Sequence, residues 1–298
     1  MKSPYFRCLR PYQWVKNLVV FMPLVFGQKL FDSVLLLQCV GAFIAFSLIA
    51  SSTYVFNDVN DLLQDQKHHE KRLRPIAAGA ISPAHAKMLG WSVLILGFAV
   101  GGMISRELAG VLFLYLVLNF FYSRFLKNIV ILDVFTLAVF FVLRICAGTV
   151  VTHVAYSFWM IFELILLAMF LGFNKRRQEI QLAEAHPEDF RHVLLKYSLY
   201  FIDQMISVIT SSLVVVYMLY CIDHDTVAKF GTRQLILSIP FVYYGIFRYL
   251  YLVHKIKMGE DPTRVLVKDR MIQINLVLWI IVCILIIYHS KVMYAFHA

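Results

Sequence analysis

The sequence has few charged residues for its length. Aspartate, glutamate, lysine and arginine together make up 15% of the 298 residues, whereas soluble domains carry about 25%. Because 60% of the residues are hydrophobic, including 25 Phe and 16 Tyr, the chain cannot stay solvated as a disordered or fibrous segment. These proportions argue against a water-soluble globular protein. They favour an all-α, polytopic integral membrane protein.

Cysteine is also scarce. The five cysteines are scattered and lie mostly in apolar runs, so their spacing indicates neither a disulfide framework nor a zinc site. The alternation of apolar and polar residues that a membrane β-barrel requires is missing, because the apolar runs are continuous. No signal-peptide pattern with a small-residue cleavage site is present, so the N-terminus reads as that of a mature protein.

Nine apolar stretches meet or approach the length of about 20 residues that a membrane-crossing helix needs. Pro23 interrupts the first, which is therefore expected to be a half-helix or to lie at an angle. We expect the nine spans to form a single transmembrane catalytic domain over residues 1–298. The predicted spans are residues 15–27, 33–57, 84–104, 107–123, 129–151, 156–175, 197–221, 234–254 and 272–290.

Positive charge is distributed unevenly between the two sides of these spans. Segments on the N-terminal side hold 20 of the 28 lysines and arginines, and segments on the other side hold five. The positive-inside bias places the N-terminus in the cytoplasm and, with nine spans, the C-terminus across the inner or plasma membrane. The N-terminal side also carries 11 of the 18 acidic residues, so we expect the active site there. A net charge of +10 gathered on one face gives no reason to expect nucleic acid as a partner.

The most informative motif follows the second predicted span. It reads Asn57-Asp58-Val59-Asn60-Asp61-Leu62-Leu63-Gln64-Asp65, and on a continuous helix its aspartates share an arc of about 60°. Such carboxylates repel one another, so a cation is expected to compensate them. Mg²⁺ shared with a diphosphate is the natural candidate, with Asp58, Asp61 and Asp65 as catalytic metal ligands. Asn57 would help to bind the substrate. The alternative is a solvated helix end whose acids balance nearby lysines.

A basic stretch follows this motif directly. Four cationic residues fall within the eight positions from 67 to 74. Such a density of positive charge suits the binding of phosphate oxygens, and Lys71 and Arg74 are the candidate residues for it. The positive-inside bias alone explains two or three of these cations. His68 and His69 are expected in a loop, with a role as metal ligands left open.

The acidic motif after the second span resembles the UbiA superfamily of intramembrane prenyltransferases, and the likeness extends over nearly the whole chain. Four stretches are similar to its decaprenyl-phosphate phosphoribosyltransferase branch: Arg10-Pro11-Tyr12-Gln13-Trp14-Val15-Lys16-Asn17, Lys71-Arg72-Leu73-Arg74-Pro75-Ile76-Ala77-Ala78-Gly79, Tyr122-Ser123-x-x-Leu126-Lys127-x-x-x-x-x-Asp133-Val134 and Leu143-Arg144-x-x-Ala147-Gly148. The resemblance implies Mg²⁺-dependent transfer of phosphoribose from 5-phosphoribosyl diphosphate (PRPP) to a polyprenyl phosphate, for cell-envelope polysaccharide precursors. It also implies that Lys16 and Asn17 bind substrate.

A departure from the general superfamily pattern supports the same branch. Ordinary members resemble one another in a second acidic motif after the sixth span, where this chain reads Asn174-Lys175-Arg176-Arg177-Gln178-Glu179. This mainly cationic cluster fits a bare phosphate of the sugar or of the lipid, and Lys175, Arg176 and Glu179 are expected to bind substrate. The alternative is a positive-inside patch in which Lys175 and Glu179 form an i,i+4 pair.

Two charged residues lie inside the fifth predicted span, where charges usually face the interior of a bundle. Asp133 and Arg144 share one stripe of the helix but lie about 16 Å apart along it, too far to touch. We expect Asp133 to be catalytic. Arg144 either serves the site or pairs with another helix, for example through Glu163.

Polar residues around the end of the fourth predicted span complete the expected site. Lys127 is expected to act in catalysis by binding a phosphate, and Asn119 and Tyr122, one turn apart, to line the substrate pocket.

Rival functions stay open. A prenyltransferase acting on an aromatic acceptor shares the fold, the metal and the first motif. A transporter or flippase is disfavoured because the loops on the far side are short and plain, whereas transport needs openings to both faces. The sequence leaves open whether the chain forms a homo-oligomer.

Overall fold

The structure is a computed structural model that describes residues 3–67, 70–183, 196–256 and 262–297, and the described residues form helices and connecting loops without a strand. The all-α fold expected from the continuous apolar runs is confirmed. The described chain divides into two compact units, unit 1 with residues 3–67, 70–155 and 183, and unit 2 with residues 156–182, 196–256 and 262–297.

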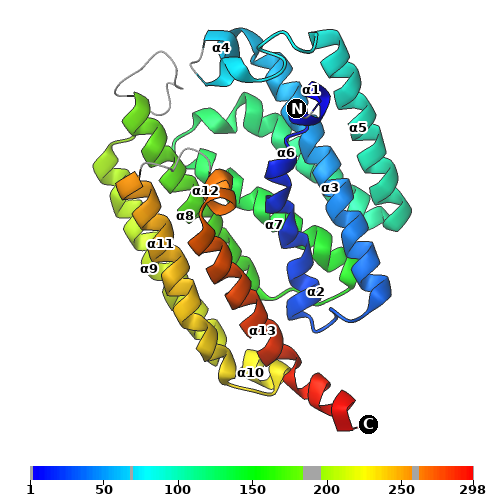
Figure 1. Cartoon of the computed structure of the whole chain (residues 1–298), viewed down its shortest axis with the longest axis vertical. Helices are drawn as coiled ribbons and strands as arrows, with labels where there is room; N and C mark the ends of the chain where they lie inside the picture. Colours follow the sequence, from blue (N-terminus) through cyan, green and yellow to red (C-terminus); the bar gives the residue numbers. More distant parts are fainter. Residues whose placement is uncertain (1–2, 68–69, 184–195, 257–261, 298) are drawn as a thin grey trace. The chain divides into compact units, whose positions relative to one another are not determined.

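Unit 1 is centred on α3, along which α5 packs, while α6 and α7 pack on α3 and on each other (Figure 1). A long 3-10 helix, η1, runs against both α3 and α7. The elements are α1 (Pro4–Cys8), η1 (Pro11–Phe21), α2 (Met22–Phe26), α3 (Ser33–Asn60), α4 (Leu62–Lys67), η2 (Lys71–Leu73), α5 (Pro83–Ile104), α6 (Arg106–Arg124), η3 (Leu126–Asn128) and α7 (Leu132–Thr152).

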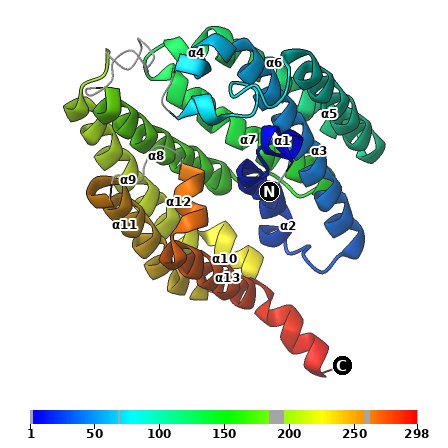
Figure 2. The same cartoon turned by 45° about the horizontal axis from the view of Figure 1, so that its top comes forward.

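Unit 2 contains the remaining helices, of which α11 packs against α9 and α13 (Figure 2). The short 3-10 helix η6 contacts the same three long helices. The elements are α8 (Phe158–Ala183), α9 (Leu199–Ile222), α10 (His224–Phe230), η6 (Gln234–Ser238), α11 (Ile239–Ile256), α12 (Pro262–Lys268) and α13 (Arg270–His297).

Side-chain caps explain where several helices begin. The carboxylate of Asp32 accepts hydrogen bonds from two backbone N–H groups in the first turn of α3, both at 3.1 Å. Ser82, Ser105, Ser198 and Asp223 cap α5, α6, α9 and α10 in the same way. Because the first N–H groups of a helix have no partner within it, such caps fix the start of each helix.

Eight helical segments of the described chain are long and apolar enough to cross a membrane, and they correspond to the last eight predicted spans. They are Ser33–Asn60, Pro83–Ile104, Arg106–Asn128, Leu132–Thr152, Phe158–Leu182, Leu199–Ile222, Gln234–Lys255 and Arg270–His289. Large apolar side chains on them point outward, with Leu37 72%, Phe158 77% and Met103 87% exposed. A surface of this kind is suited to lipid, and the chain is a multi-pass membrane protein.

The first predicted span, residues 15–27, does not form one regular helix, so the expected nine spanning helices become eight. Its residues fall in η1 and α2, and Pro23 lies at the start of α2, where a proline is tolerated. A 3-10 helix rises about 2.0 Å per residue and an α-helix about 1.5 Å, so η1 and α2 together extend about 30 Å. The segment therefore has the reach of a span, although Pro23 stands between two short elements instead of within one regular helix.

A buried arginine joins η1 to α7 inside unit 1. Arg144 is 4% exposed, and its Nε donates to Asn17 Oδ1 at 2.7 Å. Asn17 Nδ2 donates in turn to Ser47 Oγ of α3 at 2.9 Å. Three aromatic rings lie 5.1–5.4 Å from the guanidinium carbon, those of Phe46, Tyr115 and Phe141. The expectation that Arg144 pairs with another element is confirmed, and Asn17 of η1 is the acceptor of its Nε hydrogen bond.

Gly148 permits the close approach of η1 to α7. A Cβ atom at this position would lie 2.0 Å from the carbonyl oxygen of Val20. Small residues at helix contacts let two backbones approach each other in a membrane. Gly148, which ends one of the stretches that resemble the family, therefore has a packing role.

We expect Gly148→Ala to lower the thermal unfolding temperature of the detergent-solubilised protein. The added methyl group overpacks the contact with Val20, at a cost of about 1–3 kcal/mol. The matched control is Gly102→Ala, because a Cβ at Gly102 has nothing within 4 Å. Intrinsic fluorescence during heating measures both. Equal unfolding temperatures for the two variants would contradict the packing role.

Replacing Asn17 should destabilise unit 1 because it removes the acceptor of a buried charge. Asn17→Leu is expected to cost about 1.5–3 kcal/mol, the usual contribution of a hydrogen bond to a charged group. Asn17→Asp keeps an acceptor for Arg144 and should unfold at a higher temperature than Asn17→Leu. A wild-type unfolding temperature for Asn17→Leu would show that Arg144 does not depend on this contact.

Candidate active site

The acidic motif lies where α3 ends. The expected continuous helix through its three aspartates is wrong, because Asp61 leaves the helix with φ −90° and ψ 9°. The N–H of Asp61 closes the last turn of α3 on the carbonyl of Asn57 at 2.9 Å, and the chain then turns into α4. Asp58 and Asp65 therefore belong to two different helices.

Asp58 and Asp65 nevertheless meet at one guanidinium group. Nη1 of Arg74 donates to Asp58 Oδ1 at 3.0 Å and to Asp65 Oδ2 at 2.5 Å. The side chains of the two aspartates are only 4% and 5% exposed. Burial raises the pKa of Asp65, and Arg74 offsets only part of this effect. In this structure the cation between the two buried acids is Arg74, and the expected Mg²⁺ at this place stays a prediction.

A second guanidinium at this place was missed by the sequence reasoning. Nη2 of Arg10 donates to Asp58 Oδ1, and the guanidinium carbon lies 5.2 Å from the centroid of the Tyr54 ring. Burial lowers the pKa of Arg10, but the charge and hydrogen bond of Asp58, together with Tyr12 and Tyr54, outweigh it, so the net shift of this pKa is upward. Arg10 opens the stretch that resembles the family, which was the available signal. Its contact with Asp58 spans 48 residues of sequence.

Two further predicted residues lie beside these groups. Lys71, in η2, is close enough to Asp65 to lower the pKa of its carboxyl. Asn57 Oδ1 accepts a hydrogen bond from Ser123 Oγ of α6 at 3.1 Å, so its amide oxygen already has a protein partner. The structure therefore gathers Asn57, Asp58, Asp65, Lys71 and Arg74 around one end of α3.

The residues at this place fit a divalent cation only in part. Among the described residues, no three His, Cys, Asp or Glu side chains gather closely enough to hold a metal ion, so the expected set of three aspartates is not assembled. Asp58 and Asp65 do fit, because an oxygen of each lies within 3.0 Å of the same nitrogen. Mg²⁺ needs only one or two carboxylates when phosphate oxygens complete its ligands. His68 and His69 lie outside the described residues.

The other predicted residues of unit 1 lie on η1, α6, η3 and α7. The amide of Asn17 contacts Ser47 and Arg144 and so supports the fold. Asp133 is fully buried in the first turn of α7, where the helix dipole favours a carboxylate. The half-buried residues are Lys16, Asn119, Tyr122 and Lys127. Their part in binding or catalysis stays a prediction.

The cationic cluster of unit 2 is largely engaged in contacts within the protein. Arg176, whose side chain is 2% exposed, pairs with Glu179, and Lys175 Nζ lies 3.7 Å from Glu179 Oε1. The i,i+4 pair of the alternative interpretation is therefore present. The side chain of Lys175 is 37% exposed, so it is the more accessible of these two cations.

Two neighbouring residues join α8 to other helices of unit 2. Arg177 Nε donates to Asp203 Oδ1 of α9 at 2.6 Å, and Gln178 Nε2 donates to the Val253 carbonyl of α11 at 2.7 Å. These contacts hold this part of α8 against its neighbours. They give Arg177 a structural role that the sequence pattern did not reveal.

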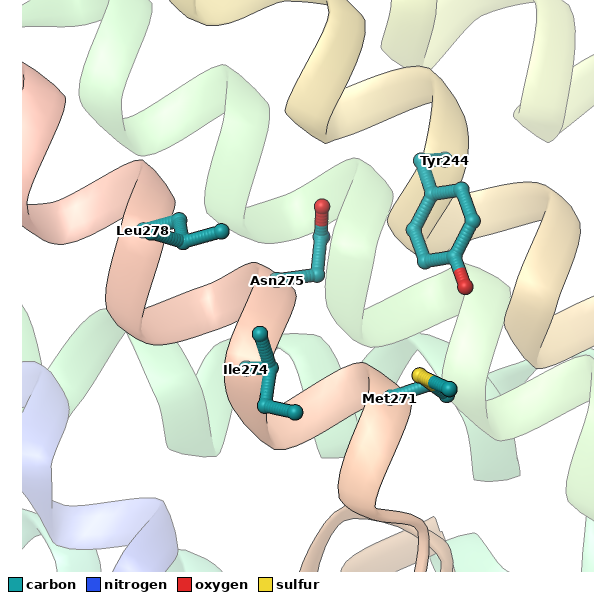
Figure 3. Close-up of a pocket in the computed structure, with 5 residues that line it drawn as sticks. All are labelled: Tyr244, Met271, Ile274, Asn275 and Leu278. Carbon is teal, nitrogen blue, oxygen red and sulfur yellow. The ribbon is translucent and has the colours of Figure 1, made fainter.

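A pocket of about 240 Å³ opens in unit 2 between α11 and α13 (Figure 3). None of its lining residues is charged, and none belongs to the predicted site. An apolar chain suits such a lining better than a phosphate does. The lining residues are Tyr244, Met271, Ile274, Asn275 and Leu278.

Comparison with known proteins identifies the family. The sequence profile of the UbiA prenyltransferase family matches residues 18–266. The decaprenyl-phosphate phosphoribosyltransferase of Mycobacterium tuberculosis is 31% identical over 278 residues, which cover 92% of this chain and 91% of that protein. The protein of the same name from Corynebacterium glutamicum is 29% identical over 291 residues, covering 95% and 86%.

Solved structures support the same fold. A UbiA homolog from Archaeoglobus fulgidus bound to GPP and Mg²⁺ has a TM-score of 0.72 and 17% identity, and the match covers 96% of this chain and 99% of that one. At this identity the likeness shows the fold alone. Together with the sequence matches, it shows that the chain is a multi-pass membrane transferase belonging to the UbiA prenyltransferase family.

Proposed function

We propose that the chain transfers 5-phosphoribose from PRPP to a membrane polyprenyl phosphate and releases diphosphate, for cell-envelope polysaccharide precursors. The observation that carries the proposal is the convergence of Asp58 and Asp65 on one positive group, with a second guanidinium alongside. Buried carboxylates that share a cation, next to arginines, suit a metal-bound diphosphate. The two curated relatives bear the name of this activity.

The residues around Asp58 would act on the leaving group. Asp58 and Asp65 would hold Mg²⁺, which would supply positive charge to a departing diphosphate. Asp61 is the third proposed ligand and would have to approach these two carboxylates, because the structure does not gather it with them. Arg10 and Arg74 would donate to diphosphate oxygens. The bond from C1 of the ribose to the diphosphate breaks, and a bond from C1 to an oxygen of the lipid phosphate forms. This oxygen is already anionic near neutral pH, so the protein needs no strong general base.

Other residues would bind the sugar and lipid phosphates. Lys71, Lys127 and Lys175 are the proposed phosphate ligands. In unit 2, Arg176 would position Glu179 through their ion pair. Asp133 is proposed as a catalytic residue. The remaining proposed contacts to the substrates are Lys16, Asn17, Asn57, Asn119 and Tyr122.

We also propose that the chain is a single catalytic domain of the inner or plasma membrane with a cytoplasmic N-terminus and active site. The family profile runs through both units, which supports one domain. The excess of lysine and arginine on the N-terminal side supports the orientation. A crossing by η1 and α2 would place the C-terminus on the opposite side.

The test of the proposed function is a transfer assay with purified protein. Labelled PRPP, a polyprenyl phosphate and Mg²⁺ should yield a phosphoribosyl lipid and diphosphate, identified by mass spectrometry. The second candidate is an aromatic prenyltransferase, since a structure of the same fold holds GPP. Turnover of a prenyl diphosphate with an aromatic acid, and no labelled lipid from PRPP, would select that candidate instead.

Asp58→Asn and Asp65→Asn should each lower the rate of phosphoribosyl transfer by about 10²–10³, the usual loss when one charge-stabilising group is removed. Asp225→Asn is the matched control, because the side chain of Asp225 is 98% exposed on α10. It should leave the rate unchanged. Near-normal rates for both Asp58→Asn and Asp65→Asn would contradict the assigned site.

Lys175→Gln should raise the KM for one phosphate-bearing substrate about tenfold while kcat changes little, because a charged hydrogen bond is lost on binding. Initial rates at varied PRPP and varied lipid identify that substrate. Lys196→Gln, which replaces an exposed lysine of the same unit, is the control. An unchanged KM for both substrates would assign Lys175 to the ion pair with Glu179 alone.

A further inference from the structure

The arginine side chains at the acidic motif are more exposed to solvent than the aspartates that they contact. The side chains of Arg10 and Arg74 are 18% and 28% exposed, whereas those of Asp58 and Asp65 are 4% and 5% exposed. An anion that approaches from solvent therefore meets the arginines first. A cation that approaches alone meets like charge before it reaches the carboxylates.

The charges of these four groups already balance. Two guanidiniums neutralise two buried carboxylates, so a divalent cation arriving alone would add two uncompensated positive charges at short range. A diphosphate that arrives with the cation changes this balance, because it supplies anionic oxygens. Arginine matches phosphate geometry well and can exchange a carboxylate for a phosphate without losing its hydrogen bonds.

The local backbone allows such an exchange. Asp58 lies in the last turn of α3, whereas Arg74 follows η2 and Arg10 lies in the turn between α1 and η1. Both arginines reach the carboxylates with long side chains from short connecting segments. Side-chain torsions alone would therefore be enough to turn the guanidiniums from the carboxylates to a bound anion, while Asp58 stays in its helix.

We infer that Arg10 and Arg74 are surrogate cations, which neutralise Asp58 and Asp65 in the absence of metal and pass to the diphosphate when metal and substrate bind. This inference rests on the proposed function and adds a mechanism of coupling to it. Diphosphate draws the arginines away from the carboxylates, and the carboxylates of Asp58 and Asp65 are then free to bind the metal. Metal binding and diphosphate binding then strengthen each other, which is a reciprocal coupling.

The test measures metal and diphosphate binding by the detergent-solubilised full chain. Mn²⁺ replaces Mg²⁺, and electron paramagnetic resonance of unbound Mn²⁺ gives its affinity in the absence of diphosphate. Binding of labelled inorganic diphosphate is measured separately with Mn²⁺ present. Arg74→Gln should bind Mn²⁺ alone on the order of tenfold more tightly than wild type, and diphosphate with Mn²⁺ on the order of tenfold more weakly.

Tighter Mn²⁺ binding together with weaker diphosphate binding by Arg74→Gln would identify the exchange of the arginine between carboxylate and diphosphate. The control Arg124→Gln removes an exposed arginine of the same unit that lies over the Phe120 ring, and neither affinity should change. If Arg74 merely supported the fold, its loss would weaken both affinities. Weaker or unchanged Mn²⁺ binding by Arg74→Gln, or unchanged diphosphate binding, would overturn the inference.

A second variant and a measurement on the wild-type chain complete the test. If Arg74→Gln does not fold, Arg10→Gln is measured in the same way, with the same signs expected. Tight binding of Mn²⁺ alone by the wild-type chain overturns the inference without any variant. A chain that forms the phosphoribosyl lipid but lacks the opposite shifts refutes the inference alone. One that shows those shifts but transfers a prenyl group refutes the proposed function alone.

Discussion

The bridge from Arg74 to Asp58 and Asp65 is the contact on which the arrangement of the acidic motif depends. Two buried carboxylates from successive helices would repel each other, and burial without a partner would be costly for both. One guanidinium nitrogen between them reduces both penalties and links the end of α3 to α4 across the turn at Asp61. The arginine of this bridge is also more exposed to solvent than either carboxylate.

The same requirement shapes the interior of unit 1. Arg144 is buried among aromatic rings, and its charge is satisfied by Asn17 and by the carbonyl of Phe140. This contact needs η1 to lie close to α7, and Gly148 provides the space. The buried charge of Arg144 and the missing side chain of Gly148 thus both allow η1 to pack against α7. That attachment lies within the stretch that also carries Arg10.

In unit 2, basic residues that resemble a binding cluster divide into two kinds. Arg176 pairs with Glu179 within α8, and Arg177 pairs with Asp203 of α9, which joins the two helices. Lys175 keeps a longer contact and a more exposed side chain. A cationic motif in sequence therefore contains both supporting and accessible charges. Burial and partners, which depend on the neighbouring helices, distinguish between them.

The sequence by itself determined the membrane class, the positions of eight long helices and the family, because apolar run length and local motifs are properties of contiguous residues. It also indicated that the acids near Asp58 need a cation. Only the tertiary structure decided that this cation is Arg74, that Arg10 joins it, and that Asp61 breaks the helix. The physical reason is that each of these features depends on partners or turns that no helical period encodes. Arg10 and Asp58, 48 residues apart, meet only through packing.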